Sequence, residues 1–308
     1  MKQRSLGSLQ VSEVGIGCNN FGVRLDQDGT TAVVNAALEA GINFFDTADI
    51  YGETRSEVQL GVALGARRSE VIIASKFGVL HDHSGFSAKP SYVAESCEAS
   101  LRRLATDVID LYQLHFPDES TPIADTIGAM QELVTQGKVR EIGCSNLSAD
   151  QLREAVAACG SGAPLVSIQS QYSLLAREPE TDGVLDLCNE LGIGFLPYYP
   201  LANGLLTGKV RPGQPIPEGT RLALMAQDRQ SHWLSERLRD RVDELVAYSD
   251  EVKVPMLTFA FSWLLNQPAV ASVIAGASNA EQVRANAQAV TELTDAQLSR
   301  LNELTANL

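Results

Sequence analysis

The feature of this sequence that most constrains its fold is a pattern that recurs along most of its length. From residue 14 onward, a short apolar run is followed by a turn and then by a longer segment with helical periodicity. The runs cover residues 14–18, 43–48, 71–76, 108–115, 139–146, 165–171, 193–199 and 271–278. Eight strands that alternate with helices predict an all-parallel sheet, and eight is the number that closes a (β/α)8 TIM barrel.

Two segments depart from the repeat. Residues 4–15, RSLGSLQVSEVG, alternate around Gly-Ser and predict a β-hairpin that plugs the bottom of the barrel. Residues 208–230 are rich in Pro and Gly and predict a long loop after the seventh strand, which at that length usually covers a site or is disordered. An extra helix is expected at the C-terminal end. No linker is evident, so residues 1–308 are expected to form one domain.

The charge and the apolar content restrict the classes of partner. A formal net charge of −14 argues against nucleic acid or an anionic membrane, because both require a basic surface. No run approaches the roughly 20 apolar residues of a membrane span, and the N-terminus lacks a secretory signal, so a cytoplasmic protein is expected. The five cysteines are scattered without CxxC spacing and are expected to be reduced structural thiols.

Polar side chains stand late in six of the eight runs. The carboxyl ends of barrel strands converge on one site, so these side chains are expected to face a common pocket. Taken singly, each has an ordinary explanation, such as a solvated lysine or an aspartate that caps a helix. Six strands that deliver polar groups to one end predict a functional site. The residues are Asp46 with Tyr51 just beyond it, Lys76, His115, Ser145 with Asn146, Gln169, and Tyr198 with Tyr199.

Tyr51, Lys76, Asp46 and His115 form a natural proton-donating set. A phenol holds its proton at neutral pH, and a nearby ammonium is expected to lower the pKa of Tyr51 and make it a better acid. Asp46 would keep Lys76 charged, and the ion pair would relieve the cost of burying the carboxylate. A neutral His115 could orient a carbonyl oxygen. Asp49 receives no role and is expected to be a solvated turn residue.

Other catalytic motifs are not supported. The sequence has no GxSxG nucleophile elbow. Residues 204–210, GLLTGKV, are one residue short of a P-loop and have Val210 where Ser or Thr would hold Mg²⁺. His81 and His83 lack a third ligand in a metal-binding motif, so no metal site is expected.

At this point the motifs resemble those of the aldo-keto reductases, NAD(P)H-dependent oxidoreductases with a (β/α)8 barrel. The resemblance runs in family order from about residue 4 to about residue 290. The matching stretches are NFFDTADIYG, VIIASKFG, IDLYQLHFPD, GKVREIGCSNLS, IQSQYSLL, YYPLANGLLTGK and VIAGASNAEQVRANAQA.

The resemblance implies a catalytic tetrad of Asp46, Tyr51, Lys76 and His115, with Tyr51 as the general acid in carbonyl reduction and the base in alcohol oxidation. It also implies a cofactor site in which amide groups hold the nicotinamide carboxamide and Tyr198 stacks on the ring. The implied cofactor residues are Gly17, Asn19, Asp46, Ser145, Asn146, Gln169, Tyr198, Tyr199, Pro200, Leu201, Asn203, Gly204, Leu206, Lys209, Arg221, Gly276, Ser278, Gln282 and Asn286.

The substrate is expected to be a small or medium aldehyde, ketone or sugar, or the corresponding alcohol. Its candidate contacts are Asn20, Phe21, Tyr51, Phe77, His115 and Phe116, and His81, His83 and Trp233 lie in loops at the same end. Packing between loops is the alternative explanation for the aromatic residues. NADP(H) is favoured over NAD(H), although Ser278 stands where many NADP-preferring relatives carry a basic residue and Arg284 lies further along. Monomer and homo-oligomer are both compatible.

Two other functions remain open at this stage. Lys76 could act as a Schiff-base nucleophile, as in aldolases on the same barrel, although Tyr51 and the cofactor set argue against this lyase. A non-catalytic subunit that only binds the cofactor is also compatible, because some relatives act as sensors or channel partners.

Overall fold

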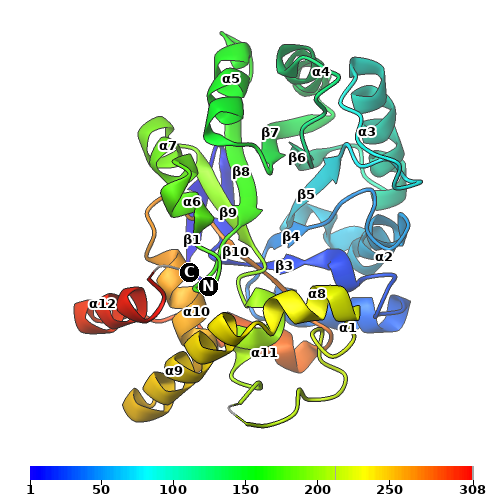
Figure 1. The fold of residues 1–308 in the computed structure, drawn as a ribbon. Helices are drawn as coiled ribbons and strands as arrows, with labels where there is room; N and C mark the ends of the chain where they lie inside the picture. Colours follow the sequence, from blue (N-terminus) through cyan, green and yellow to red (C-terminus); the bar gives the residue numbers. More distant parts are fainter. Residues whose placement is uncertain (212, 307–308) are drawn as a thin grey trace.

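A computed structural model describes residues 1–211 and 213–306, and eight parallel strands form its central sheet (Figure 1). The order around the sheet is β10-β3-β4-β5-β6-β7-β8-β9. Phe195 of β9 exchanges backbone hydrogen bonds with Ala269 and Ala271, just ahead of β10, so the barrel is nearly closed. All eight predicted strands are confirmed. Their bounds are β3 (Val14–Gly17), β4 (Phe44–Asp46), β5 (Ile72–Phe77), β6 (Ile109–Leu114), β7 (Val139–Ser145), β8 (Leu165–Gln171), β9 (Gly194–Tyr198) and β10 (Val273–Gly276).

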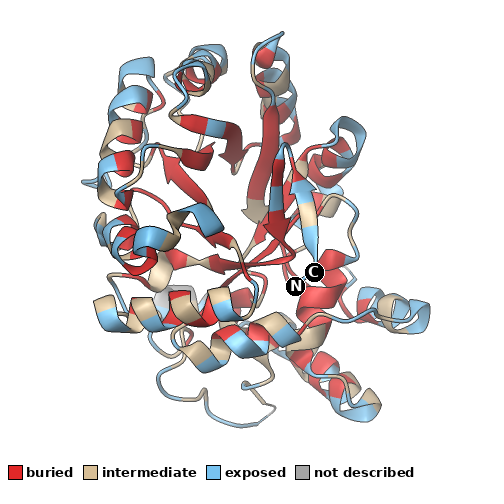
Figure 2. Ribbon diagram, turned by 180° about the vertical axis from the view of Figure 1, so that it is seen from behind, coloured by how far each residue is buried: buried red, intermediate tan, exposed pale blue. Residues whose placement is uncertain are grey.

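Helices surround the barrel and bury one face each against it (Figure 2). In α3, Val93, Cys97, Leu101 and Leu104 recur at helical spacing and are buried, whereas Ala94, Glu95 and Arg102 on the outer face are exposed. The helices are α1 (Gln27–Glu39), α2 (Arg55–Leu64), α3 (Pro90–Leu104), α4 (Ile123–Thr135), α5 (Ala149–Cys159), α6 (Glu178–Thr181), α7 (Val184–Leu191), α8 (Gln227–Trp233), α9 (Glu236–Val252), α10 (Met256–Leu265), α11 (Ala280–Gln288) and α12 (Asp295–Leu304). Helix α12 is the extra C-terminal helix that the sequence predicts.

The N-terminal hairpin fills the bottom of the barrel, as predicted. Strands β1 (Gln3–Leu6) and β2 (Leu9–Ser12) pair antiparallel across Gly7 and Ser8. Leu6, Leu9 and Val11 are buried in one apolar cluster with side chains from the barrel strands. The barrel residues of that cluster are Phe44, Ala74, Leu111, Val166, Leu196, Ala271 and Ile274. The hairpin therefore closes the end of the barrel opposite the carboxyl ends of its strands.

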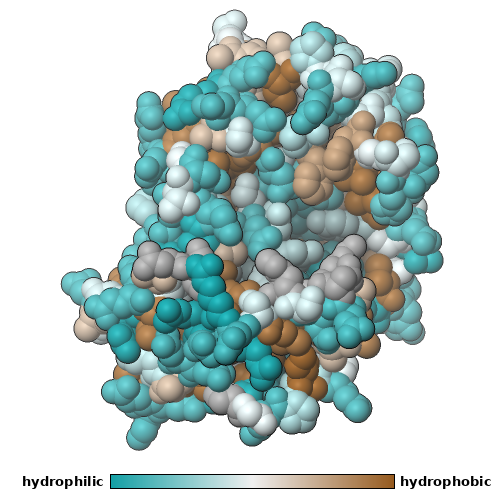
Figure 3. Space-filling model, in the orientation of Figure 1, coloured by the Kyte–Doolittle hydropathy of each residue, from teal (hydrophilic) through white to brown (hydrophobic). Residues whose placement is uncertain are grey.

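The long loop after β9 is also present. A short 3₁₀ helix, η3 (Ala202–Thr207), is followed by a segment without regular helix or strand up to α8, which begins at Gln227, inside the predicted loop. Pro212 of this loop lies outside the described residues. The face of the molecule in Figure 3 is mainly hydrophilic and is hollowed near its middle. Among the described residues, no helix combines the length and apolar character needed to span a membrane.

The hairpin plug leads to a prediction about stability. Leu6→Ala should lower the free energy of unfolding by about 2–4 kcal/mol, because it opens a cavity beneath the barrel. Chemical denaturation measures this change. Leu224→Ala is the matched control, because Leu224 is 65% exposed and should tolerate the same truncation. Equal stability of the two variants would contradict the plugging role.

Candidate active site

A cavity of about 780 Å³ opens at the carboxyl ends of the barrel strands. Its wall combines residues from these strand ends with the loop after β9 and the start of α11, which is where a parallel barrel places its functional site. Many residues proposed from the sequence lie together in this wall. They are Gly17, Asn19, Asn20, Asp46, Tyr51, His115, Phe116, Ser145, Asn146, Gln169, Tyr198, Tyr199, Pro200, Leu201, Asn203, Gly204, Lys209, Arg221, Gly276, Ser278, Gln282 and Asn286.

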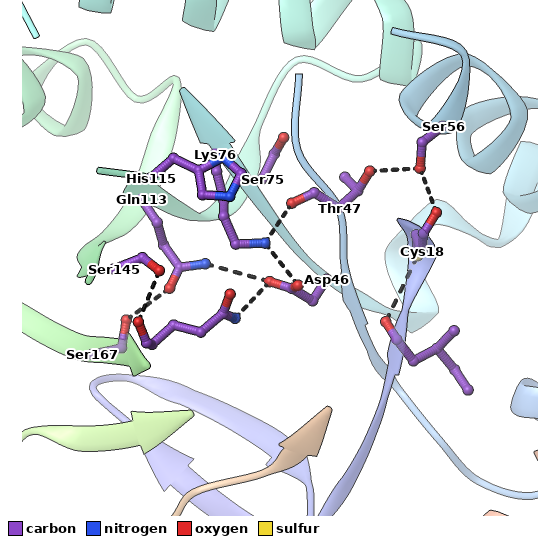
Figure 4. Close-up of polar contacts among 12 residues, drawn as sticks. Cys18, Asp46, Thr47, Ser56, Ser75, Lys76, Gln113, His115, Ser145 and Ser167 are labelled. Atoms are coloured by element: carbon purple, nitrogen blue, oxygen red, sulfur yellow. Dashed lines mark hydrogen bonds and ion pairs between the residues drawn. The ribbon is translucent and has the colours of Figure 1, made fainter. Parts of the chain in front are cut away.

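A buried ion pair lies at the base of this cavity (Figure 4). Lys76 Nζ lies 2.7 Å from Asp46 Oδ2 and also donates to the Thr47 carbonyl at 2.9 Å. Gln169 Nε2 donates to the second carboxylate oxygen of Asp46 at 3.0 Å, and Gln113 reaches the same oxygen at 3.5 Å. Lys76 and Asp46 are both buried. This hydrogen bonding satisfies both carboxylate oxygens, so the pair can persist in the interior.

Tyr51 lies beside the ammonium group of this pair. Lys76 Nζ is 5.1 Å from the centroid of the Tyr51 ring. Burial raises the pKa of Tyr51 above its ordinary value, and the Lys76 ammonium opposes that rise. The net direction is therefore opposite to the lowered pKa expected from the sequence, because burial outweighs the ammonium. Although burial lowers the pKa of Lys76, the charges of Asp46 and Tyr51 raise it overall, so Lys76 carries its proton.

His115 faces Tyr51 from the end of β6. The two rings meet edge to face with centroids 5.8 Å apart. Burial, followed by the charge of Lys76, lowers the pKa of His115 to about 3. At neutral pH the imidazole is uncharged, so it can hydrogen-bond to a carbonyl oxygen without adding a positive charge.

The ends of β7, β8 and β9 are joined by a chain of polar contacts. Ser145 Oγ donates to the Gln169 carbonyl at 2.8 Å, and Asn146 Nδ2 donates to Ser145 Oγ at 3.0 Å. Tyr198 Oη donates to Asn146 Oδ1 at 2.9 Å. Asn146 has a φ of 59°, in the left-handed region that asparagine tolerates better than most residues. These contacts fix an amide-rich wall next to the face of the Tyr198 ring.

The loop after β9 supplies cationic and backbone groups. Arg221 lies 4.8 Å above the centroid of the Tyr199 ring and donates to its hydroxyl at 3.2 Å. Tyr199, Asn203 and Gly204 all have positive φ, which bends this backbone sharply along the cavity wall. Asn203 Oδ1 is buried and has no hydrogen-bond partner in the described part of the chain. A bound polar ligand is a natural partner for such an atom.

The last part of the wall comes from β10 and α11. The backbone N–H of Ser278 donates to Gln282 Oε1 at 2.9 Å. Asn279 caps the start of α11 by accepting from the Gln282 N–H. Arg284 lies 3.5 Å from Glu39, and both side chains are more than half exposed. The N-terminus of α11 offers a positive potential to an anionic group, which could replace these side-chain acceptors at the backbone N–H groups of Ser278 and Gln282.

Some sequence-based assignments are corrected by where the side chains lie. Phe21, Phe77 and Leu206 are fully buried, and none of them lines the cavity, so they are removed as direct ligand contacts. Phe77 stacks on Tyr112 outside the barrel, because neighbouring strand residues point to opposite faces and Lys76 points inward. Asp49 is completely buried and is not the solvated turn residue that was expected.

His81, His83 and Trp233, which the sequence places only in loops at the substrate end, do not line the cavity. His81 and His83 are on the loop between β5 and α3 and are exposed, and Trp233 is buried in the core. The sequence interpretation missed Arg24, which lines the cavity and whose pKa is lowered by burial and by the charge of Arg221. No motif marks it, because it lies in the irregular segment before α1. The wall also contains Thr207, Val210, Pro217, Glu218, Gly219, Thr220, Leu222, Leu257, Ile274, Ala275 and Ala285.

Comparison with known proteins decides the family. The model of the aldo/keto reductase family matches residues 13–306 of this sequence. The chain belongs to this family. One curated relative of this aldo-keto reductase, the uncharacterized oxidoreductase YqkF of Bacillus subtilis strain 168, is 36% identical over 314 residues, covering 99% of this chain and 97% of the relative. A probable voltage-gated potassium channel subunit beta of Arabidopsis thaliana is 34% identical over 303 residues, covering 94% of this chain and 91% of the relative.

Solved structures show the same fold and family. The aldo-keto reductase AKR11C1 from Bacillus halodurans, in its holo form, matches with a TM-score of 0.82 and 35% identity over 99% of this chain and 96% of that one. The glycerol dehydrogenase AKR11B4 from Gluconobacter oxydans matches with a TM-score of 0.85 and 27% identity over 99% and 95%. This aldo-keto reductase is an oxidoreductase that acts on carbonyl or alcohol groups.

The ion pair at the base of the cavity leads to a prediction about stability. Lys76→Met should lower the free energy of unfolding by about 3–5 kcal/mol, because it leaves Asp46 buried without its counter-ion. The double variant Asp46→Asn/Lys76→Met should lose less, since no charge then remains buried. Urea denaturation of both proteins measures the difference. A single variant at least as stable as the double variant would contradict the account.

Proposed function

We propose that this aldo-keto reductase reduces a carbonyl compound with NAD(P)H and that Tyr51 is its general acid. The supporting observation is the position of the Tyr51 ring, 5.1 Å from the ammonium of a buried ion pair and 5.8 Å from a neutral imidazole. Tyr51, His115 and Asp46 line the cavity, whereas Lys76 does not line it and is paired with Asp46 at its base. This arrangement provides one proton donor and one further hydrogen-bonding group for a single carbonyl oxygen.

The wall of the cavity suits a nicotinamide dinucleotide. Ser145, Asn146 and Gln169 would hold the carboxamide, and Tyr198 would stack on the ring. Lys209 and Arg221 would face the phosphates, together with the backbone of residues 199–204 and the start of α11. The buried, unpartnered Oδ1 atoms of Asn19 and Asn203 fit a polar ligand at this place. When bound, the reduced nicotinamide supplies the hydride for the reaction.

The residues of this chain would then complete the reduction by transferring a proton. Tyr51 donates its hydroxyl proton to the oxygen of the former carbonyl, and Lys76 stabilises the phenolate that remains. Asp46 keeps Lys76 charged and fixed in place, because it holds the ammonium at 2.7 Å. His115 orients the carbonyl oxygen as a neutral hydrogen-bonding group. In alcohol oxidation the same phenol would act in reverse as the base.

The Schiff-base alternative loses support from the environment of Lys76. A lysine nucleophile must be unprotonated and must reach the substrate. Lys76 is fully buried, is absent from the cavity wall and has a raised pKa that keeps it protonated. A lyase that uses this lysine would therefore require a rearrangement of the ion pair.

A non-catalytic role is the second candidate, and the Arabidopsis relative favours it. That protein is named as a probable potassium channel subunit beta, and the alignment covers almost the whole of both chains. A subunit of this kind would bind the dinucleotide in the same cavity without needing turnover. Turnover of the purified protein distinguishes the two roles.

The coenzyme and the compartment can also be proposed. NADP(H) is favoured over NAD(H), because α11 carries Arg284 two residues from the cavity-lining Gln282 and Asn286, and its ion pair with Glu39 is exposed and weak. A reducing compartment such as the cytoplasm suits the chain, since Cys18, Cys97, Cys144, Cys159 and Cys188 are all free and buried. No group of three possible metal ligands occurs among the residues described, and the proposed reaction requires none.

The decisive experiment is a turnover assay with both coenzymes. Purified protein with NADPH or NADH is mixed with a panel of aldehydes, ketones and sugars, and the nicotinamide absorbance is followed, with alcohols and oxidised coenzyme in the reverse direction. Loss of absorbance with at least one carbonyl compound is expected. No turnover, together with tight coenzyme binding, would favour the non-catalytic role.

The role of Tyr51 leads to a prediction about the chemical step. Tyr51→Phe should reduce kcat by about 100-fold or more, because the variant keeps the ring but lacks the proton donor. Coenzyme affinity, measured by fluorescence titration, should stay nearly unchanged. Tyr248→Phe is the control, since Tyr248 stacks on Phe259 among the outer helices. Loss of coenzyme binding in Tyr51→Phe would mean that the phenol has a different role.

The coenzyme preference leads to a prediction about Ser278. Ser278→Arg should raise the ratio of kcat/KM for NADPH over NADH by about tenfold, because a guanidinium can bind the additional phosphate through two hydrogen bonds. Steady-state kinetics with each coenzyme measure the ratio. Ser278→Gln is the uncharged control. If Ser278→Arg and Ser278→Gln raised this ratio equally, the additional phosphate of NADPH would not bind next to residue 278.

A further inference from the structure

Asp49 is a fully buried carboxylate for which the proposed reaction has no use. It follows Asp46 by three residues, and its backbone N–H donates to the Lys76 carbonyl at 3.0 Å. Its side chain is completely buried, and neither carboxylate oxygen has a hydrogen-bond partner among the residues that the structure describes. An unsatisfied buried polar group costs free energy. A carboxylate in this state needs a functional reason to be kept.

The nearest cations are engaged with other carboxylates. Arg103 of α3 lies 2.6 Å from Glu57 of α2, and Lys76 of β5 is paired with Asp46. Burial, followed by the charge of Glu57, raises the pKa of Asp49 to about 7, against smaller opposing effects of Arg103, the backbone N–H of Ile50 and Lys76. Ionised Asp49 is therefore unstable in this setting unless another partner reaches it.

The other titratable groups that face Asp49 are two phenols and one imidazole. The phenols of Tyr92 on α3 and Tyr112 on β6 have pKa values raised by burial, so both are neutral at physiological pH. The imidazole belongs to His81, whose Nε2 lies 3.8 Å from Asp49 Oδ2. That distance is within ion-pair range but too long for a hydrogen bond. A movement of about 1 Å would complete the bond.

His81 is carried by a short hairpin arm, residues 79–86, between β5 and α3. Val79 and Phe86 form an antiparallel bridge, and further backbone hydrogen bonds lie between them. At the tip, the backbone N–H and hydroxyl of Ser84 both donate to Asp82 Oδ1. These internal bonds make the arm a unit, so a shift of His81 also moves Phe86.

Phe86 connects the arm to the substrate side of the cavity. The residue is 47% exposed, and its ring centroid lies 5.1 Å from that of Phe116. Phe116 in turn stacks on His115 at 5.1 Å, and both of these residues line the cavity. One side of the arm therefore faces the unsatisfied Asp49, and the other side carries an aromatic ring to the rim of the active site.

We propose that the hairpin arm covers the substrate side of the cavity and that pairing of His81 with Asp49 holds it in place. Asp49 is a positioning residue, because it acts through His81 and the arm. The inference rests on the reductase function proposed above and adds a substrate class to it. Phe86 and Phe116 present aromatic surface at the rim, so the carbonyl substrates that gain from this cover carry an aryl or branched apolar group.

The pairing makes substrate binding depend on pH. Above about pH 7 Asp49 is ionised and can accept a hydrogen bond from His81 once the arm moves about 1 Å closer. Once Asp49 is protonated, it is no longer a charged acceptor for His81, and the arm is released. Affinity for an apolar carbonyl compound should therefore fall as the pH falls through about 7. The free energy of unfolding should instead increase as the pH falls through about 7, because a carboxylate with a raised pKa destabilises the native state when it ionises.

The test uses benzaldehyde as the apolar substrate, glycolaldehyde as the small polar one, and NADPH. Asp49→Asn and His81→Asn should each raise the KM for benzaldehyde about two- to fivefold at about pH 8, the range expected for the loss of one hydrogen bond at a partly exposed site, with kcat unchanged. The KM for glycolaldehyde should not change. His83→Asn is the matched control, since His83 lies on the same arm and is exposed. Wild-type KM for benzaldehyde should rise toward about pH 5.5, and the rise should be absent in Asp49→Asn.

Two readouts do not require turnover. By NMR at about pH 8, the ring chemical shifts of His81 should differ between Asp49→Asn and the wild type, because the carboxylate 3.8 Å from Nε2 is gone. The melting temperature of Asp49→Asn should be higher than that of the wild type at about pH 8, since a buried charge is removed.

The outcomes separate this inference from the proposed function. If the wild type reduces benzaldehyde and both variants keep its KM, the cover is overturned and the reductase function stands. If the wild type reduces neither aldehyde nor any other carbonyl compound, the reductase function fails. Identical His81 ring chemical shifts at about pH 8 in the wild type and Asp49→Asn would overturn the pairing in either case.

Discussion

The ion pair between Asp46 and Lys76 is the interaction on which the rest of this site depends. The register of β4 and β5 pairs Asp46 with Ala74, which places Lys76 one inward-facing position further along the neighbouring strand. The two charges are buried together, and the Thr47 carbonyl and the Gln169 amide complete their hydrogen bonding. Either charge alone would be costly in this interior. The barrel supplies both, and the pair gives Tyr51 a fixed positive neighbour.

The two ends of the barrel have different physical demands. At the bottom, the hairpin fills the interior with Leu6, Leu9 and Val11, so that end contributes apolar packing. At the top, the interior is polar, and Asn146 and Tyr199 adopt left-handed backbone conformations that most side chains avoid. Strain and buried charge at the functional end are tolerated because the rest of the barrel is well packed.

The strands and the convergence of Asp46, Tyr51, Lys76 and His115 could be predicted because both follow from simple rules. Apolar runs separated by helical segments specify a parallel barrel, and side chains at the carboxyl ends of its strands must converge. The alternation of side chains along a strand could also have excluded Phe77 as a substrate contact, since its neighbour Lys76 points into the barrel. Other features depend on tertiary packing that no local pattern records. Arg24 reaches the cavity from an irregular segment, and Asp49 is buried only because α2, α3 and the hairpin arm meet above it.

The direction of the Tyr51 pKa is a related case. The sequence identifies the Lys76 ammonium, which lowers the pKa of Tyr51. The degree of burial decides whether that pKa is raised or lowered overall, and burial depends on the barrel and on the loops above it. The Lys76 ammonium opposes the rise in the pKa of Tyr51, so the phenol holds its proton less tightly than burial alone would dictate.

The most direct test of this account is an NMR titration of Tyr51 labelled with ¹³C at the Cζ atom, in the wild type and in Lys76→Met. Tyr51→Phe assigns the signal. If the ammonium favours the phenolate as described, the Tyr51 signal should titrate at a lower pH in the wild type than in Lys76→Met. The same titration midpoint in both proteins would show that the ion pair does not control the phenol, and the central claim would fail.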